Sequence, residues 1–275
     1  MSITVNTNTS ALMAQTKLGS TNRSLSGSFE RLSSGLRISK AADDAAGMAV
    51  ADNLDTVARS ARVAMRNAND GVSIVSTAEG ATNEVTNIVK RMRELAVQSS
   101  SETLSNNERT YIQDEFEALS AEVDRIATTT EFNNTALSDG STTQMDVQVG
   151  VNGTADDRVT VTLGDLRATI LGVDTASLDL STATGAQAAI TALDTSLDTV
   201  SAYRSDLGAS QNRLTSSLSN MEVYYSNLKS AESIIRDADF AHETAELTKN
   251  QIMQQAGISV LAQAKSVSQS ALSLL

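Results

Sequence analysis

The sequence contains no cysteine, no proline and no tryptophan. Without cysteine the chain has no disulfide, no thiolate nucleophile and no cysteine-ligated metal site. Without proline no backbone donor is missing from a helix interior, so very long helices are permitted. Four Phe and four Tyr are the only aromatic residues among 275. We therefore expect thin helical seams rather than a wide core filled with aromatic side chains.

Positive charge is also scarce, because the formal net charge is −12 and the pI is about 4.5. This balance argues against nucleic acid as a partner. Acidic residues gather in residues 131–200, where ten Asp or Glu face only Arg158 and Arg167. Residues 1–43 instead carry five Lys or Arg against Glu30 and Asp43. The middle of the chain is therefore expected to be a solvated outer surface.

Long hydrophobic runs are absent as well. The longest, Ala45 to Ala51, is far too short to cross a bilayer, so no membrane insertion is expected. Residues 1–6 have neither the basic nor the apolar region of a secretory signal peptide. Taken alone, these features predict a cytoplasmic protein.

The feature that organises the chain is an apolar row in residues 190–235. Its members recur at seven-residue spacing: Leu193, Val200, Leu207, Leu214, Met221, Leu228 and Ile235. This heptad pattern predicts one helix with a coiled-coil-like seam, roughly 70 Å long at 1.5 Å per residue. Because only one stripe of this helix is apolar, an equally long partner must lie along it.

Other segments supply such partners. A seven-spaced row at Ala11, Leu18, Leu25 and Leu32 predicts an amphipathic helix near the N-terminus, and a second helix is predicted over about 44–99. Ser105 followed by Glu108 forms a capping box before an apolar stripe, which predicts a helix over about 106–129. A last helix is predicted from about Phe240, with Leu261 and Leu272 on its apolar side. The leucines that close the sequence suggest an assembly contact.

The periodicity changes in residues 131–185, where Ser, Thr, Asp and Gly dominate. Met145, Val147 and Val149 alternate with polar residues, as do Val159 and Val161, which predicts a β-hairpin within about 135–185. A hairpin is unstable alone, so it should pack on the helices. The predicted fold class is mainly α: a long antiparallel helical rod with coiled-coil-like packing and a small β-hairpin.

Candidate chemistry is sparse. His242 is the only histidine; Glu243 follows it, but position 246 is Glu, so the zinc-protease spacing fails. Asp237, Asp239 and Glu243 lack the spacing of a calcium loop. We expect no enzyme activity, no metal and no cofactor.

Several motifs closely resemble those of bacterial flagellins. The N-terminal motifs are 31-RLSSGLRI-38, 43-DDAAGMAV-50, 66-RNANDG-71, 77-TAEG-80, 93-RELAVQ-98 and 131-EFN-133, and the C-terminal motifs are 208-GASQNRL-214, 237-DAD-239, 254-QQA-256, 261-LAQA-264 and 272-LSLL-275. They follow the family's order and leave out only about 135–185. The resemblance therefore covers nearly the whole chain.

The resemblance implies a filament subunit that forms a helical homopolymer. Residues 1–43 and 236–275 would form the inner, filament-core domain, and residues 44–235 the rod domain, without the large variable domains of many flagellins. It also implies export, unfolded, through the flagellar type III pathway, which reverses the cytoplasmic prediction in favour of an extracellular filament. Implied partners are an export chaperone, the filament cap and the hook–filament junction proteins.

The family is also sensed by Toll-like receptor 5 through the rod domain. By position, the matching residues are Arg91, Leu95 and Glu115, while Lys90 stands where recognised members usually carry Gln. The residues predicted to form the assembly seam are the heptad row of 190–235 together with Leu18, Leu25, Leu32, Leu261 and Leu272.

Two alternatives remain open from the sequence. A hook–filament junction protein shares both terminal regions of the family, but usually matches these motifs only partially. An adhesin or immune ligand would use the acidic middle as a binding surface, although an acidic solvated hairpin explains it as well. Polymerisation of the purified chain would separate these alternatives from a filament subunit.

Overall fold

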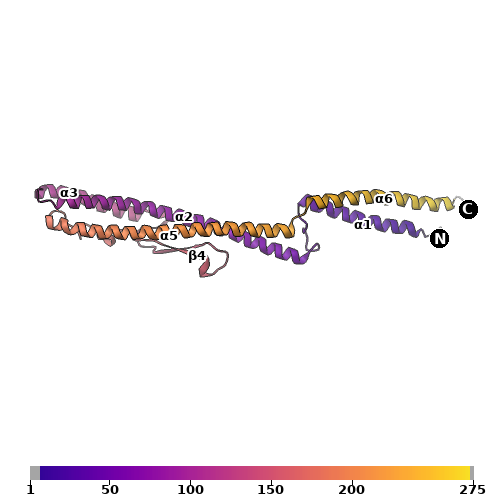
Figure 1. Cartoon of the computed structure of the whole chain (residues 1–275), viewed down its shortest axis with the longest axis horizontal. Helices are drawn as coiled ribbons and strands as arrows, with labels where there is room; N and C mark the ends of the chain where they lie inside the picture. Colours follow the sequence, from indigo (N-terminus) through magenta and orange to yellow (C-terminus); the bar gives the residue numbers. More distant parts are fainter. Residues whose placement is uncertain (1–6, 273–275) are drawn as a thin grey trace. The chain divides into compact units, whose positions relative to one another are not determined.

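The computed structural model describes residues 7–272, with side chains to residue 266. The helices are α1 (Thr9–Ser34), α2 (Ala45–Ser99), α3 (Asn106–Thr129), α4 (Ala168–Leu171), α5 (Ala183–Arg236) and α6 (Phe240–Leu272), shown in Figure 1. The strands are β1 (Glu131–Phe132), β2 (Thr135–Ala136), β3 (Gln144–Gln148) and β4 (Arg158–Thr162). The mainly α prediction, with a small antiparallel hairpin, is confirmed.

The chain forms two compact units. One comprises residues 59–226 and holds most of α2, all of α3 and most of α5. The other contains the two ends of the chain, up to Ala58 and from Asn227 onward. Both boundaries fall inside α2 and α5, whereas the sequence-based division lies at the ends of these helices. The first turns of α2 belong with the last turns of α5 because Asp52 and Asp55 form ion pairs with Arg236 and Lys229.

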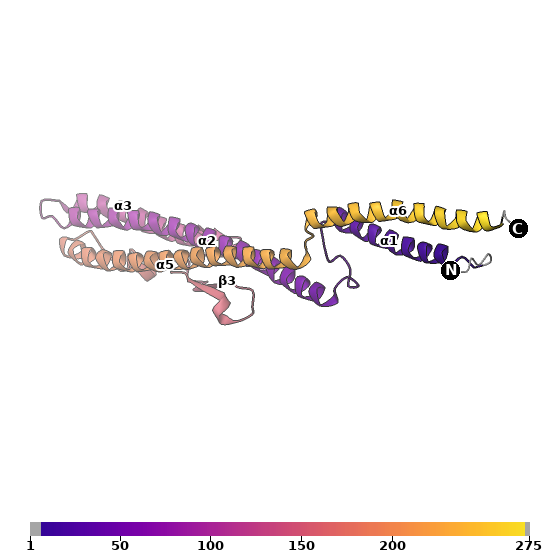
Figure 2. The same ribbon diagram turned by 45° about the vertical axis from the view of Figure 1, so that its right-hand side comes forward.

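Within residues 59–226, α2, α3 and α5 run side by side in both views (Figures 1 and 2). We call this unit the bundle. Its helices meet in a continuous core, in which Met92, Phe116, Leu193 and Val200 have no exposed surface. The loop around α4 closes the same core with Leu166, Leu171, Leu178 and Leu180. Three helices thus bury their apolar stripes fully against one another.

The hairpin packs on the bundle through one face. β3 pairs antiparallel with β4, with Met145 opposite Val161 and Val147 opposite Val159. Val147, Val159 and Val161 join Leu207 and Leu214 of α5 in a second core cluster. The alternation read from the sequence is thereby confirmed, because its apolar members point to the helices and its polar members to solvent.

The helix ends follow local chemistry. Ser105 and Glu108 form the predicted capping box at the start of α3. Gly35, at φ 72°, ends α1 in the left-handed conformation that glycine adopts without strain. α5, however, begins at Ala183, two turns before the predicted start near residue 190. The buried residues of those turns are Ala186 and Ala189, which a search for large apolar residues overlooks.

In the unit formed by the chain ends, α1 lies antiparallel to α6, and we call these two helices the end-helix pair. The side-chain amide of Asn8, before α1, donates to the carbonyl of Ala264 near the end of α6, at 2.8 Å. At the other end, Leu36 and Asp237 form an isolated antiparallel bridge. No helix among residues 7–272 combines the length and apolarity that crossing a membrane requires.

Candidate assembly surface

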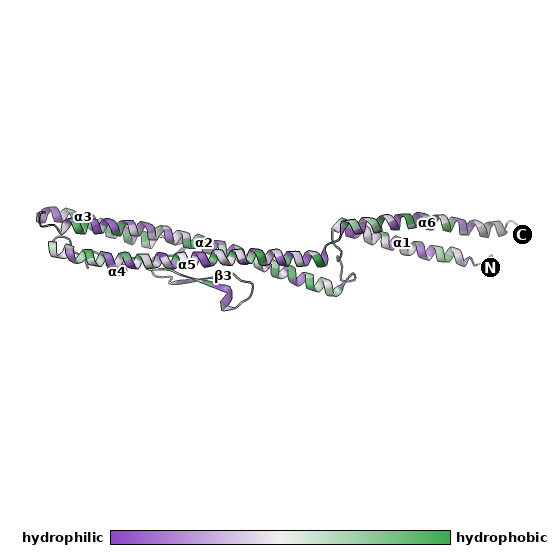
Figure 3. Cartoon of the chain, viewed as in Figure 1, coloured by the Kyte–Doolittle hydropathy of each residue, from purple (hydrophilic) through white to green (hydrophobic). Residues whose placement is uncertain are grey.

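The end-helix pair leaves its apolar side chains open to solvent. Among its described side chains only Ser28 of α1 and Glu243 of α6 are buried. Eight large apolar residues are more than half exposed: Leu12, Met13, Phe29, Phe240, Ile252, Met253, Ile258 and Val260. Figure 3 shows hydrophobic residues recurring along the visible face of α6. An exposed apolar surface of this extent on two helices marks an interaction site.

A two-helix contact explains why so little is buried. Leu18, Leu25 and Leu32 of α1 and Leu261 of α6 are half-buried, because each helix of the pair has one neighbour and every contact residue keeps a solvent-facing edge. Polar contacts fix the register: the side-chain amide of Gln254 donates to that of Asn22 at 2.8 Å.

A groove of about 470 Å³ runs between the two helices. Met13, Leu18, Met253 and Val260 give it apolar walls, and Lys17 is its one charged lining residue. Gly257 forms part of its floor, where an added Cβ would lie 3.3 Å from a methyl carbon of Leu18. The groove can accept an apolar side chain from outside the chain.

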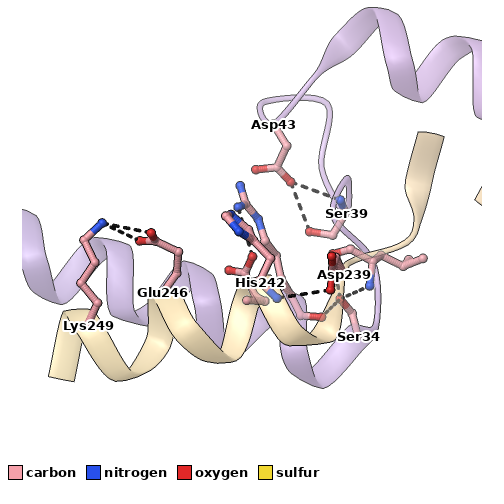
Figure 4. A network of polar contacts seen from close by, with 10 residues as sticks. Ser34, Ser39, Asp43, Asp239, His242, Glu246 and Lys249 are labelled. Carbon is pink, nitrogen blue, oxygen red and sulfur yellow. Dashed lines mark hydrogen bonds and ion pairs between the residues drawn. The ribbon is translucent and has the colours of Figure 1, made fainter. Parts of the chain in front are cut away.

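Most charged side chains of the pair lie toward its other end. There Asp239 accepts hydrogen bonds from the backbone N–H groups of Ala241 and His242 at the start of α6 (Figure 4). Asp43 accepts from the N–H groups of Ser39 and Lys40, and these bonds lower the pKa of its carboxyl group.

Two ion pairs lie in the same region as these hydrogen bonds. Arg31 forms a long ion pair, at 3.9 Å, with the buried carboxylate of Glu243. Lys40 pairs with Glu30, and that hydrogen bond raises the pKa of the Lys40 ammonium. These contacts organise the segment that follows α1 and the start of α6. No group of three or more metal-ligating side chains occurs among the described residues.

The predicted seam residues fall into two sets. Leu193, Val200, Leu207 and Leu214 are buried inside the bundle, and Leu228 is buried at the end of α5. They pack against other parts of the same chain. Met221 and Ile235 are half-buried, like the leucines of the end-helix pair. Leu272 lies outside the residues whose side chains the structure describes.

The three residues matched to receptor recognition differ in accessibility. Arg91 of α2 donates two hydrogen bonds to Glu115 of α3, at 2.8 and 3.0 Å, and one to Glu94. Both side chains of this pair are nearly half exposed. Leu95 is only 1% exposed and belongs to the bundle core. In this conformation a receptor can reach Arg91 and Glu115 but not Leu95.

The seven-residue spacing did not identify the most exposed members of the surface. Leu12, Met13, Met253 and Val260 lie beside the rows read as seams, on the sides that no helix of the chain covers. A usable signal was the distribution of charge. Residues 250–264 contain no charged side chain, and residues 9–22 contain only Lys17. A solvated helix surface would carry more charge than this.

Comparison with known proteins covers nearly the whole chain. Residues 5–143 match the bacterial flagellin N-terminal helical region, and residues 190–275 match the bacterial flagellin C-terminal helical region. A flagellin of Halalkalibacterium halodurans is 42% identical over 271 residues, which is 98% of this chain and 99% of that protein. The flagellar filament 33 kDa core protein of Treponema phagedenis is 40% identical, with coverage of 98% and 99%. Bacillus cereus flagellin, at 30% identity, aligns in structure with 57% of this chain and 88% of its own, with a TM-score of 0.49.

Proposed function

The chain belongs to the bacterial flagellin family, and we propose that it polymerises through the exposed apolar surface of its end-helix pair. As a flagellin it is a structural subunit of the extracellular flagellar filament and not an enzyme. The single observation that carries the proposed mechanism is the exposure of eight large apolar side chains on α1 and α6.

The energetics of burial support this mechanism. Covering one Leu, Ile, Met or Phe side chain stabilises a complex by roughly 1.5–3 kcal/mol. Bringing two molecules together costs roughly 4–15 kcal/mol in lost translational and rotational freedom. A handful of such residues buried per contact therefore favours association, and a filament contact repeats along the polymer.

The chemistry of the surface favours a second copy as its occupant. Residues 9–22 of α1 and 250–264 of α6 form the part of the pair that holds the groove, and Lys17 is their one charged side chain. A basic partner would find no counter-charge there and an acidic partner only that of Lys17, whereas the same apolar and amide-rich surface of another copy is complementary to it. We assign the groove at Met13 and Met253 to an apolar side chain from the end helices of a neighbouring subunit.

We also propose that the two parts of the chain take different positions in the filament, as the resemblance implies. Residues 1–43 and 236–275 would line the filament core, and residues 44–235 would lie outward, in keeping with the acidic stretch 131–200. Export in an unfolded state through the flagellar type III pathway is part of this proposal. The shallow burial of α1 and α6 supports it, since helices with few buried contacts open at low cost.

We also propose specific partners for export and assembly. They are an export chaperone that covers the apolar ends before assembly, the filament cap and the hook–filament junction proteins. For Toll-like receptor 5 we propose recognition through Arg91 and Glu115, which are accessible. The receptor reaches Leu95 only if the bundle opens locally. Arg91→Ala should therefore weaken receptor binding more than Leu95→Ala does, when the two variants are compared at equal concentrations of correctly folded protein.

Seeded polymerisation tests the proposed function. The purified chain is salted out in the presence of short filament seeds, and polymer is measured by sedimentation and electron microscopy. Ile252→Asp places a charge on the exposed face of α6, where Ile252 is 61% exposed, and should abolish elongation. Val63→Asp is the matched control, because Val63 of the bundle is 44% exposed and lies outside the proposed surface.

Circular dichroism should show equal helix content for both variants, since neither residue is buried. Elongation by Ile252→Asp at the wild-type rate would contradict the proposed surface. A wild-type chain that caps the seeds without elongating them would favour the hook–filament junction alternative, which no observation on this chain supports at present.

A further inference from the structure

Methionine is distributed unevenly between buried and exposed positions. Of the seven methionines among the described residues, only Met13 and Met253 are exposed, at 69% and 56%. Met92 has no exposed surface. The other four, Met48, Met65, Met145 and Met221, are half-buried. The two accessible thioethers come from opposite ends of the sequence, 240 positions apart, and line the same groove between α1 and α6.

We propose that Met13 and Met253 are oxidation sites at which peroxide-class oxidants block assembly of the free subunit, and that reduction restores it. This inference rests on the proposed function, because it requires the groove to be an assembly contact. It adds a chemical control to that contact.

The reaction needs no group from the protein beyond the thioether. The sulfur lone pair attacks one oxygen of hydrogen peroxide, the O–O bond breaks, and a sulfur–oxygen bond forms. The second oxygen leaves as hydroxide and takes the proton from the oxygen now bonded to sulfur, which gives water. Sulfur loses two electrons and the peroxide gains them. Each thioether becomes a sulfoxide, which is polar and chiral and no longer suits an apolar contact.

The position of the sulfurs determines the consequence. Both line a groove whose remaining walls are mostly apolar, with Leu18 and Val260 beside them. A sulfoxide oxygen in that groove loses its water when a neighbouring subunit covers it, and it finds mainly apolar partners, since only Ser10, Lys17 and Thr21 among the lining residues are polar. The free subunit, in which both side chains stay solvated, keeps its fold. Oxidation should therefore raise the critical concentration for polymerisation without unfolding the bundle.

Assembly should in turn protect the sites. In the polymer the groove is occupied, so Met13 and Met253 should react more slowly than in the free subunit, while the half-buried methionines of the bundle keep their rate. Reactivity of the two sulfurs is thus a readout of groove occupancy that does not depend on imaging.

The experiment treats the free full-length chain with hydrogen peroxide, maps the added oxygen by peptide mass spectrometry and then measures seeded polymerisation. We expect oxygen first at Met13 and Met253 and a rise in critical concentration of about tenfold or more, which corresponds to about 1.4 kcal/mol. Methionine sulfoxide reductases acting on both epimers should restore the original value.

Variants separate this effect from general damage. Met13→Leu/Met253→Leu keeps the groove apolar and removes both thioethers. Its critical concentration is measured first without peroxide, and peroxide should then leave that value unchanged. Met48→Leu/Met65→Leu, the matched control on α2, should remain as sensitive as the wild type. The proposal would be overturned if peroxide raised the critical concentration of Met13→Leu/Met253→Leu as much as that of the wild type. It would also be overturned if oxygen appeared early at all mapped methionines. A wild-type chain that fails to polymerise before any treatment would instead overturn the proposed function, and the effect on assembly with it.

Discussion

The bundle and the end-helix pair are built from helices of similar apolar content, yet they bury it to very different extents. In the bundle Phe116, Leu193 and Leu214 have no exposed surface. In the pair Leu18 and Leu261, which were predicted as seam residues in the same way as Leu193 and Leu214, are only half-buried. The difference is one of neighbours, since a helix in the bundle packs against two others and a hairpin, while α1 and α6 have only each other. A stripe that is half covered within the chain remains available for contacts between chains.

Ion pairs do not compensate for this difference. The cross-helix pairs of the bundle, Arg91–Glu115 and Arg93–Asp194, have side chains that are 42–50% exposed. Such surface pairs stabilise a fold only weakly, because water screens them. The stability of the bundle therefore comes from its apolar core, and the pair, which lacks such a core, must gain its stability on assembly.

The largest effect should come from deleting a core side chain in the bundle. Leu193→Ala removes a fully buried leucine and should lower the free energy of unfolding of the free chain by about 2–5 kcal/mol. Urea unfolding followed by circular dichroism measures this.

Leu261→Ala in the end-helix pair is the counterpart. It should change monomer unfolding by much less, because Leu261 is only half-buried. It should instead raise the critical concentration for polymerisation. Equal destabilisation of the free chain by the two variants would contradict the comparison between the two units.

Glycine substitutions should have opposite signs in the two units. At Gly71 of α2 an added Cβ would lie 3.1 Å from a methyl carbon of Val147 and 3.2 Å from one of Leu214. Gly71→Ala should therefore push the hairpin and α5 away from α2 and destabilise the bundle by about 1–3 kcal/mol. At Gly19 of α1 no atom lies within 4 Å of the added Cβ. Gly19→Ala should stabilise α1 by up to about 1 kcal/mol through helix propensity.

Differential scanning calorimetry would measure the first effect, and amide hydrogen exchange across α1 the second. Slower exchange in Gly19→Ala supports open space at that position. Unchanged stability in Gly71→Ala would contradict the close approach of the hairpin to α2.

The sequence was most informative where periodicity and capping chemistry agreed. The capping box at Ser105 and Glu108 placed the start of α3, because a capping box requires specific hydrogen bonds at that position. The hairpin was placed by the alternation of Val147, Val159 and Val161 with polar residues. These signals are local and therefore readable from a single sequence.

The assembly surface was less readable, because a heptad row does not say which helix covers it. Leu193 and Leu18 have the same spacing, yet the first is buried within the chain and the second is half open. Burial depends on the number of neighbouring helices, which is a property of the tertiary structure. The early start of α5 was missed for a related reason, since Ala186 is buried in the core by the tertiary structure and its small side chain gives no sign of this in the sequence.

Acid should weaken the bundle more than the end-helix pair. Six carboxyl groups in residues 59–226 have a lowered pKa: Glu108, Glu122, Asp139, Asp165, Asp179 and Asp194. In the other unit the described carboxyl group with a lowered pKa is that of Asp43. A lowered pKa means that the folded state favours the ionised form. This stabilisation is fully present above the ordinary pKa near 4 and is lost as the pH falls through the lower folded value.

The urea midpoint of the free chain should therefore fall between pH 5 and pH 3, by a modest amount because these groups are mostly exposed and screened. Asp165→Asn removes the carboxylate that Arg167 holds in its charged form. The urea midpoint of this variant should therefore depend less on pH than that of the wild type. Asp43→Asn is the control in the other unit and should leave the dependence of bundle unfolding as in the wild type. A midpoint that rises on acidification would contradict the direction of these pKa shifts.

The smallest expected effect concerns a single buried hydroxyl of the bundle. Ser196 of α5 is 1% exposed, and its Oγ has no hydrogen-bond partner among the described residues. Its neighbour Thr195 donates to the carbonyl of Thr191, and the buried Thr82 of α2 donates to that of Ala78 at 2.7 Å. Ser196→Ala removes a desolvated hydroxyl and adds a better helix former, so the chain should become more stable by up to about 1 kcal/mol. Thr82→Val keeps the volume but loses a hydrogen bond, so the same urea titration should show a loss of stability. The two buried hydroxyls differ mainly in whether they have a hydrogen-bond partner. A lower urea midpoint for Ser196→Ala than for the wild type would contradict the prediction, because it would mean that the Ser196 hydroxyl makes a stabilising contact.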